Sequence, residues 1–203
     1  MAEPEAPAAP SGIASIADPA PLGLAAFALT TFLLSASNAH LTRGTGAAWL
    51  GYALAYGGLV QLLAGMWEFR RGNVFGATAF STYGGFWIGL FLYQIFVKSN
   101  NATNDLGWIL LAFAIFNLYM LAASSQINAA VFAVFLTLQL TEIVLFIGFF
   151  ANNENIIKTG GYIGIVTALT AWYGSFAGVF NSFGGSLSLP VGKPLMRTAT
   201  TTA

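Results

Sequence analysis

Residues 129–150 read AAVFAVFLTLQLTEIVLFIGFF and contain one ionisable side chain, Glu142. A helix needs about 20 apolar residues to cross the hydrocarbon core of a bilayer, and this run is long enough. It also lacks the polar face at 3.6-residue spacing that a helix on the surface of a soluble protein would have. The run therefore predicts a transmembrane helix.

Five similar apolar runs accompany it along the chain. The six predicted segments are residues 22–40, 47–67, 74–97, 106–123, 129–150 and 160–180. Of the seven basic and seven acidic residues, Glu142 alone lies inside a segment. Because a charge at mid-membrane costs at least a few kcal/mol, this distribution predicts an all-α integral membrane protein with six transmembrane helices around a central pathway.

Composition excludes several classes of function. Charged residues make up 7% of the chain and the net charge is zero, so the chain has no electrostatic attraction to nucleic acid. There is no cysteine and a single histidine, His40, so thiolate metal sites and paired-histidine haem sites are excluded. We expect no metal and no cofactor. We also expect no enzyme, because no nucleophile is paired with a base.

The two ends of the chain are more polar than its middle. Residues 1–17 are rich in proline and predict a disordered tail, residues 18–185 form the transmembrane domain, and residues 186–203 form a polar tail. Six crossings place both termini on one side. That side carries four Lys or Arg against three on the other, which favours cytoplasmic termini.

Glu142 is the strongest candidate for a functional side chain. A lone carboxyl group near mid-membrane would be neutral, since desolvation disfavours its charged form, and could carry a proton. The alternative is a neutral Glu142 that only bonds to a neighbouring helix. Glu68, by contrast, stands beside Arg70 and Arg71, where we expect an exposed ion pair at a helix end.

Gly51, Gly58 and Gly65 recur every seven residues in the second segment. Such a stripe allows another helix backbone to approach closely. The stripe could serve packing inside one subunit or a contact between subunits, and the sequence leaves both open.

Several motifs then follow one another in a characteristic order. They are Asp18-Pro19-Ala20-Pro21-Leu22-Gly23-Leu24, Tyr56-Gly57-Gly58, Gln61, Gly65, Glu68, Gly72-Asn73, Phe75-Gly76 and Tyr83-Gly84-Gly85-Phe86-Trp87. This series resembles the acetate uptake transporter family, the succinate–acetate permeases, whose hallmark is Asn-Pro-Ala-Pro-Leu-Gly-Leu. Asp18 stands where that hallmark has Asn. The replacement changes the chemistry of the position, because an ionised carboxylate accepts hydrogen bonds but cannot donate them.

The resemblance implies a plasma-membrane transporter or channel for acetate and, in some members, succinate. It implies a homohexamer whose subunits each enclose a pathway, with a constriction at Phe27, Tyr83 and Leu136. A residue of helix six that shapes substrate size corresponds to Ala171.

Further residues are expected along the pathway. Thr30 and Thr31 would supply hydrogen bonds in a vestibule, Gln61 would line the pathway, and Glu142 is the candidate for proton coupling. Two other functions stay open at this point: a channel for small neutral solutes such as urea or ammonia, and a membrane sensor without flux.

Overall fold

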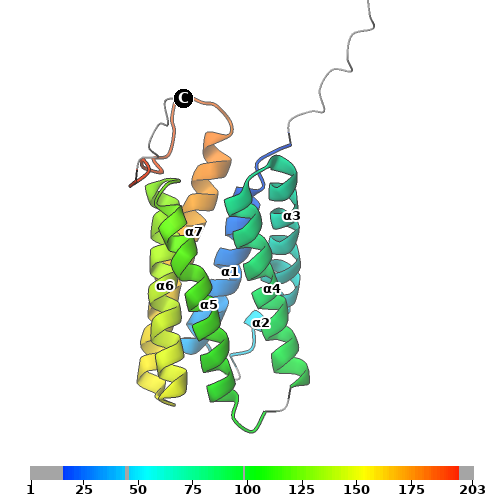
Figure 1. Cartoon of the computed structure of the whole chain (residues 1–203), viewed down its shortest axis with the longest axis vertical. Helices are drawn as coiled ribbons and strands as arrows, with labels where there is room; N and C mark the ends of the chain where they lie inside the picture. Colours follow the sequence, from blue (N-terminus) through cyan, green and yellow to red (C-terminus); the bar gives the residue numbers. More distant parts are fainter. Residues whose placement is uncertain (1–15, 44–45, 98, 197–203) are drawn as a thin grey trace, which may run out of the picture.

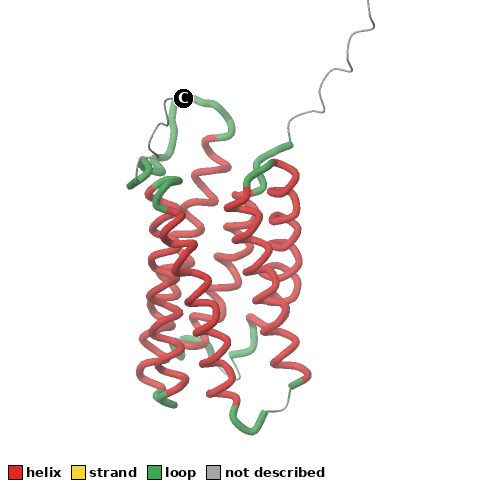
Figure 2. Tube along the Cα trace, viewed as in Figure 1, coloured by secondary structure: helices red, strands yellow, loops and turns green. Residues whose placement is uncertain are grey.

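The computed structural model describes residues 16–43, 46–97 and 99–196 (Figure 1). Every regular element within these residues is a helix (Figure 2). The elements are α1 (Ala20–Asn38), α2 (Trp49–Leu54), the π-helix η1 (Ala55–Val60), α3 (Gln61–Arg71), α4 (Val74–Phe96), α5 (Ala102–Ser124), α6 (Ala129–Phe150) and α7 (Glu154–Asn181). The predicted all-α class is confirmed. Of the expected tails, residues 1–15 and 197–203 lie outside the described residues.

The described chain runs through the bundle six times, because α2, η1 and α3 join end to end as one segment. α5 begins at Ala102 rather than at 106, and α7 begins at Glu154 rather than at 160. Apolar runs mark the part of a helix that lies in hydrocarbon, whereas these two helices continue into a polar zone. There the Asn153 side chain caps α7 by accepting two backbone N–H bonds.

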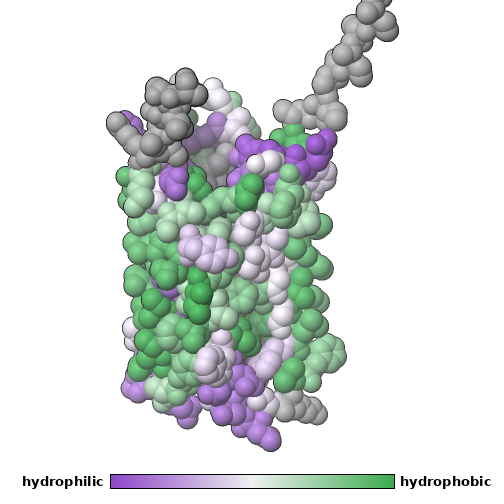
Figure 3. Space-filling model, in the orientation of Figure 1, coloured by the Kyte–Doolittle hydropathy of each residue, from purple (hydrophilic) through white to green (hydrophobic). Residues whose placement is uncertain are grey.

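The lengths and the surface of the helices fit a bilayer. α1, the joined α2–η1–α3 segment, α5, α6 and α7 are long and apolar enough to cross a membrane. α4 is 23 residues long and has no charged residue, but its Gly, Ser, Thr and Tyr residues lower its hydropathy. Figure 3 shows a broad apolar band across the middle of the visible face of the bundle, with hydrophilic residues gathered at both ends.

The helices form a closed circle. α1 packs on α7, α7 on α6 and α6 on α5, while α3 packs on both α4 and α1. The circle closes between α4 and α5, which meet least closely. Aromatic side chains fill that joint: Tyr83 and Phe86 of α4 pack against Phe113 of α5, and Tyr83 also packs edge to face on Phe116. The interior is therefore enclosed on all sides.

The π-helix η1 divides the predicted glycine stripe. Gly58 and Gly65 face α4: a Cβ atom would lie 2.7 Å from Ile88 at the first position and 2.7 Å from the backbone nitrogen of Ser81 at the second. Gly51 faces open space, since the wider π turn changes the helical register between it and Gly58. Packing inside one subunit accounts for Gly58 and Gly65.

Residues that follow α7 fold back over the end of the bundle. The Tyr173 hydroxyl donates to the Pro190 carbonyl at 2.6 Å, and the Asn181 amide bonds to both backbone groups of Leu189. The backbone N–H of Ala130 donates to the Val191 carbonyl at 2.9 Å. The described part of the predicted polar tail is thus packed on α6 and α7. The described N-terminal residues lie at the same end of the bundle (Figure 1).

Two consecutive glycines of α4 provide a matched test of this packing. A Cβ atom at Gly84 would lie 2.8 Å from the backbone nitrogen of Leu62, whereas one at Gly85 would meet nothing within 4 Å. Gly84→Ala should push α3 and α4 apart and cost about 1–3 kcal/mol of stability. Gly85→Ala should not lower the stability, because alanine favours helix more than glycine does. Equal melting temperatures of the two detergent-extracted variants would contradict the packing.

Candidate functional site

Phe27 of α1, Tyr83 of α4 and Leu138 of α6 meet in one buried cluster in the bundle interior. The rings of Phe27 and Tyr83 pack edge to face, with centroids 5.7 Å apart and an angle of 62° between their planes. None of the three side chains is more than 6% exposed. These three residues, termed the apolar ring below, leave little room between them.

Leu136 does not belong to this ring, although the resemblance implied it. Its side chain is 40% exposed on the outside of α6. Two positions along an α-helix correspond to a rotation of about 200°, so Leu136 and Leu138 point in nearly opposite directions. Leucine recurs too often in this helix for the sequence to fix which one faces inward.

The apolar ring separates two cavities. The inner cavity, of about 40 Å³, lies toward the C-terminal end of α1, and a smaller cavity of about 20 Å³ lies on the other side. Phe27, Tyr83 and Leu138 are the residues that line both. The inner cavity adjoins a vestibule of about 220 Å³, and Asn38 is among the residues that line both. The three spaces follow one another through the bundle, with the apolar ring as the barrier.

A chain of buried hydrogen bonds starts at the Tyr83 hydroxyl. Its oxygen lies 3.0 Å from Asn117 Oδ1 and 3.2 Å from Glu142 Oε1. Asn117 Nδ2 donates at 2.9 Å to both the Phe135 carbonyl and Gln139 Oε1. Tyr83, Asn117 and Glu142 come from α4, α5 and α6, so this chain ties three helices together around the ring.

Several buried polar atoms near the ring have no hydrogen-bond partner within the described residues. Thr31 Oγ1, Trp87 Nε1 and Glu142 Oε2 belong to residues that line the inner cavity. Gln61 Oε1 belongs to a residue that lines the smaller cavity. Since an unpaired buried polar atom costs about 1–3 kcal/mol, these atoms indicate where a polar ligand or water would bind.

The other predicted pathway residues differ in position. Thr31 and Gln61 line a cavity on either side of the ring. Ala171 of α7 is fully buried in the same cluster as the ring. Thr30 instead packs against Gly57 of η1, and its hydroxyl donates to the Ala26 carbonyl at 3.1 Å. Thr30 therefore joins two helices and does not line either cavity.

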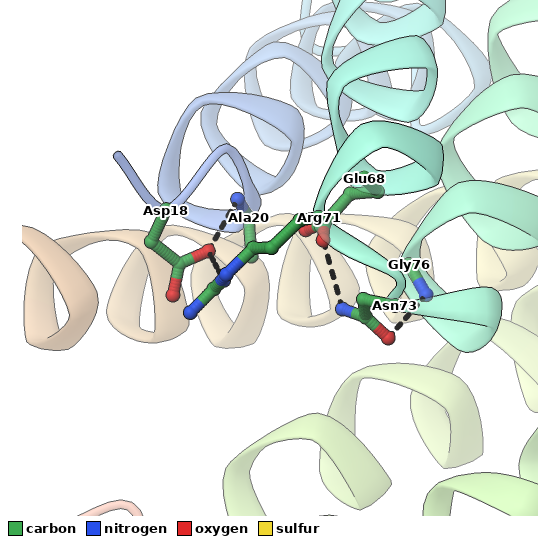
Figure 4. A network of polar contacts seen from close by, with 6 residues as sticks. All are labelled: Asp18, Ala20, Glu68, Arg71, Asn73 and Gly76. Atoms are coloured by element: carbon green, nitrogen blue, oxygen red, sulfur yellow. Dashed lines mark hydrogen bonds and ion pairs between the residues drawn. The ribbon is translucent and has the colours of Figure 1, made fainter. Parts of the chain in front are cut away.

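The motif that contains Asp18 begins α1 at the end of the bundle where the chain termini lie. Asp18 accepts a hydrogen bond from the Ala20 N–H at 2.9 Å and forms an ion pair with Arg71 (Figure 4). Both charged side chains of that pair are exposed, so the pair contributes little stability. The ion pair thus links the start of α1 to the end of α3 and adds little to the stability.

Glu68 is not the exposed partner of Arg70 or Arg71 that the sequence suggested. It is fully buried, and its Oε2 accepts from Asn73 Nδ2 at 2.9 Å (Figure 4). Asn73 also caps α4, since its Oδ1 accepts from the Gly76 N–H. Glu68 faces inward because Gly76 has no side chain: a Cβ there would lie 2.8 Å from Glu68 Cδ.

Sequence reasoning missed Asn117, which is 0% exposed and joins Tyr83 to Gln139. The available signal was an amide within an otherwise apolar run, since such groups in membrane helices usually bond to a neighbouring helix. Sequence reasoning also gave no role to Trp87. This residue lines the inner cavity, and its indole nitrogen has no hydrogen-bond partner within the described residues.

Comparison with known proteins agrees with this architecture. The sequence profile described as the GPR1/FUN34/yaaH family matches residues 2–193. A solved structure titled "Structure of the bacterial acetate channel SatP" superposes with a TM-score of 0.81 at 34% identity, covering 87% of this chain and 99% of that one. The chain is accordingly an all-helical integral membrane protein.

Three curated relatives have informative names. Acetate permease A of Emericella nidulans is 41% identical over 86% of this chain, and ammonia transport outward protein 2 of Saccharomyces cerevisiae is 38% identical over 84%. This chain spans only 65% and 64% of their lengths. Succinate-acetate/proton symporter SatP of Escherichia coli is 35% identical over 90% of this chain and 98% of its own.

The role of Asn117 can be tested by stability. Asn117→Leu should leave Gln139 Oε1 and the Phe135 carbonyl without this donor and the Tyr83 hydroxyl with Glu142 alone, at a cost of several kcal/mol. Asn104→Leu makes the same change near the start of α5, where the side chain is only half-buried, and serves as the control. If both variants unfold at the same temperature in detergent, Asn117 does not hold the bundle together.

Proposed function

The chain belongs to the GPR1/FUN34/yaaH family, and from that membership and the geometry of the apolar ring we propose that it carries acetate and related small carboxylic acids, succinate included, across a membrane. The observation that carries the proposal is a pair of neighbouring cavities. Among the described residues that line them, the two cavities share Phe27, Tyr83 and Leu138. A thin apolar barrier between two cavities is the arrangement expected of a gated pathway.

Transport would begin in the vestibule. Ser37, Asn38 and Gln94 line it and can donate hydrogen bonds to a carboxylate. The solute then passes to the inner cavity, loses its remaining water at the apolar ring, and crosses when the ring side chains move apart. Hydrophobic constrictions open and close in this way, by wetting and dewetting.

The proposal includes proton coupling through Glu142. Glu142 is 4% exposed, lies beside the ring residue Tyr83, and lines the inner cavity. An ionised carboxylic acid would cross an apolar barrier only at a large cost, because a charge leaves water there. A proton that travels with the acid removes this cost. The name of the Escherichia coli relative, a proton symporter, supports such coupling.

Substrate size would be set at the ring and just beside it. Leu138 belongs to the ring, and Ala171 is fully buried in the same cluster. The small side chain of Ala171 leaves the ring room to relax, and a larger side chain there would restrict it. Gln61 and Thr31 would supply hydrogen bonds on either side of the barrier. Pro19, Pro21 and Gly23 of the motif fix the start of α1, which carries Phe27.

The proposal also covers assembly and location. We take the protein to be a homohexamer of the plasma membrane with cytoplasmic termini, on the basis of the resemblance and of the basic residues at the terminal side. Native mass spectrometry of the detergent-extracted protein should give six copies of the chain. A monomer under those conditions would contradict the assembly.

Ammonia is a second candidate substrate, because one relative carries ammonia transport in its name. An apolar barrier without charged residues would also pass a small neutral solute. Competition separates the two candidates: unlabelled acetate should suppress the uptake of labelled acetate by the reconstituted protein, whereas an ammonium salt of a non-transported anion should not.

Proteoliposomes that contain the chain should take up labelled acetate faster than empty liposomes. Leu138→Ala should widen the ring and raise the uptake of longer acids, such as butyrate, relative to acetate by several fold. Leu136→Ala is the matched control, since its side chain lies outside the bundle.

Uptake by the wild type at the rate of empty liposomes would refute the proposed function. Equal effects of the two leucine variants would instead show that the ring is misplaced.

A further inference from the structure

The inner cavity combines three unpaired polar atoms with apolar walls. Thr31, Trp87 and Glu142 are 6%, 2% and 4% exposed, and each has a side-chain N or O atom without a partner. All three residues line this one cavity, from α1, α4 and α6. Half of the six such unpaired atoms in the described residues belong to its lining. This concentration indicates a binding site for a group with its own donors and acceptors.

The cavity is small and has no positive charge. Its volume of about 40 Å³ would hold about three or four water molecules, which need about 10–15 Å³ each. No Lys, Arg or His lines it, and besides Glu142 its one titratable lining residue is Tyr83 of α4, while α1 and α5 contribute none. A carboxylate anion bound there would meet the Glu142 carboxyl and no compensating cation. Two carboxyl groups so close cannot both be ionised.

The hydrogen-bond directions show how many protons the site needs. A backbone carbonyl can only accept, so Asn117 Nδ2 must face the Phe135 carbonyl, and Gln139 Nε2 must face the Ala114 carbonyl. Asn117 Oδ1 is then left as an acceptor for the Tyr83 hydroxyl.

The single proton of the Tyr83 hydroxyl cannot serve two acceptors fully. While Tyr83 donates to Asn117, its contact with Glu142 Oε1 is satisfied only if Glu142 itself carries a proton. The network is therefore complete with a protonated Glu142, and it leaves Glu142 Oε2, an atom of a residue that lines the cavity, without a partner.

We propose that the inner cavity binds the carboxyl group of the transported acid between Thr31, Trp87 and Glu142, with one proton shared between that carboxyl group and Glu142. The proposal rests on the proposed function, and it names the group that the site recognises. The Trp87 N–H and the Thr31 hydroxyl donate to the oxygens of the acid, and Phe27 and Leu138 face its hydrocarbon part.

The shared proton has a balanced path. In the free protein the O–H of Glu142 is directed at the Tyr83 oxygen, 3.2 Å away. When the anion binds, the Tyr83 hydroxyl turns from Asn117 and donates to Glu142, and the Glu142 carboxyl group turns its own O–H toward the substrate. The O–H bond at Glu142 then breaks and an O–H bond forms at an oxygen of the substrate, which gives the neutral acid and a Glu142 carboxylate stabilised by Tyr83. The neutral acid crosses the apolar ring, and Glu142 regains a proton from the vestibule side. No further reactant is required.

The binding contacts are tested first, in proteoliposomes with labelled acetate. Trp87→Phe removes the N–H, and Thr31→Val replaces the hydroxyl with a methyl group of similar size. Each should raise the acetate concentration for half-maximal uptake about tenfold, the effect of losing a hydrogen bond to a charged acceptor. Trp172→Phe and Thr170→Val, on α7 outside the cavity walls, are the matched controls and should leave that concentration unchanged.

The shared proton is tested with Glu142→Gln, which keeps the shape of the neutral side chain but has no proton to give. With acetate outside at pH 7, an alkaline interior should accelerate uptake by the wild type, after subtraction of empty liposomes. In Glu142→Gln the ratio of the uptake rate with an alkaline interior to the rate without one should fall toward one. A merely structural role of Glu142 would lower the amount of folded protein but would leave the acceleration intact.

The results distinguish a failure of the proposed function from a failure of the proposed binding site. A wild type that carries no acetate refutes the proposed function itself. A wild type that carries acetate, with Trp87→Phe and Thr31→Val at the wild-type half-saturation concentration, overturns the binding site alone. Full acceleration by the pH gradient in Glu142→Gln overturns the shared proton. If one variant elutes as aggregate on size exclusion, the others decide the question.

Discussion

The Tyr83 hydroxyl is a polar group held in the middle of an apolar bundle, and it must be hydrogen-bonded there because no bulk water reaches it. Asn117 of α5 and Glu142 of α6 meet that requirement at 3.0 and 3.2 Å. The same bonds fix the tyrosine ring against Phe27 of α1. Four helices are thus held by one residue, and the position of the barrier follows from the bonds of that residue.

This coupling explains why the two sides of the barrier differ. On the vestibule side the residues around Tyr83 bring unpaired atoms of Thr31, Trp87 and Glu142 to one cavity, whereas Gln61 provides one such atom on the other side. A solute would therefore be held by hydrogen bonds before the barrier and released into a less polar space beyond it. A pathway built in this way binds a small acid without a fixed positive charge, and it makes the proton on Glu142 part of recognition.

The sequence predicted the six crossings well, because apolar runs bounded by charge depend only on the composition of each segment. It predicted less about the interior. Leu136 and Leu138 are alike in composition, and only the rotation of α6 distinguishes them. Glu68 lies inward against Gly76 of α4, and the π-helix η1 lies against Thr30 of α1 at Gly57; no local pattern encodes either contact. Asn117 was visible as an amide in an apolar run, but its partners come from two other helices.

If the apolar ring is the barrier, the two cavities that it separates are reached from opposite sides of the membrane. The chain contains no cysteine, so single cysteines can report on each space without a background signal. Asn38→Cys lies at the vestibule side of the ring and Leu24→Cys at the other. In vesicles of one orientation, a membrane-impermeant thiol reagent should modify each of these cysteines from a different side. Modification of both from the same side would contradict the account.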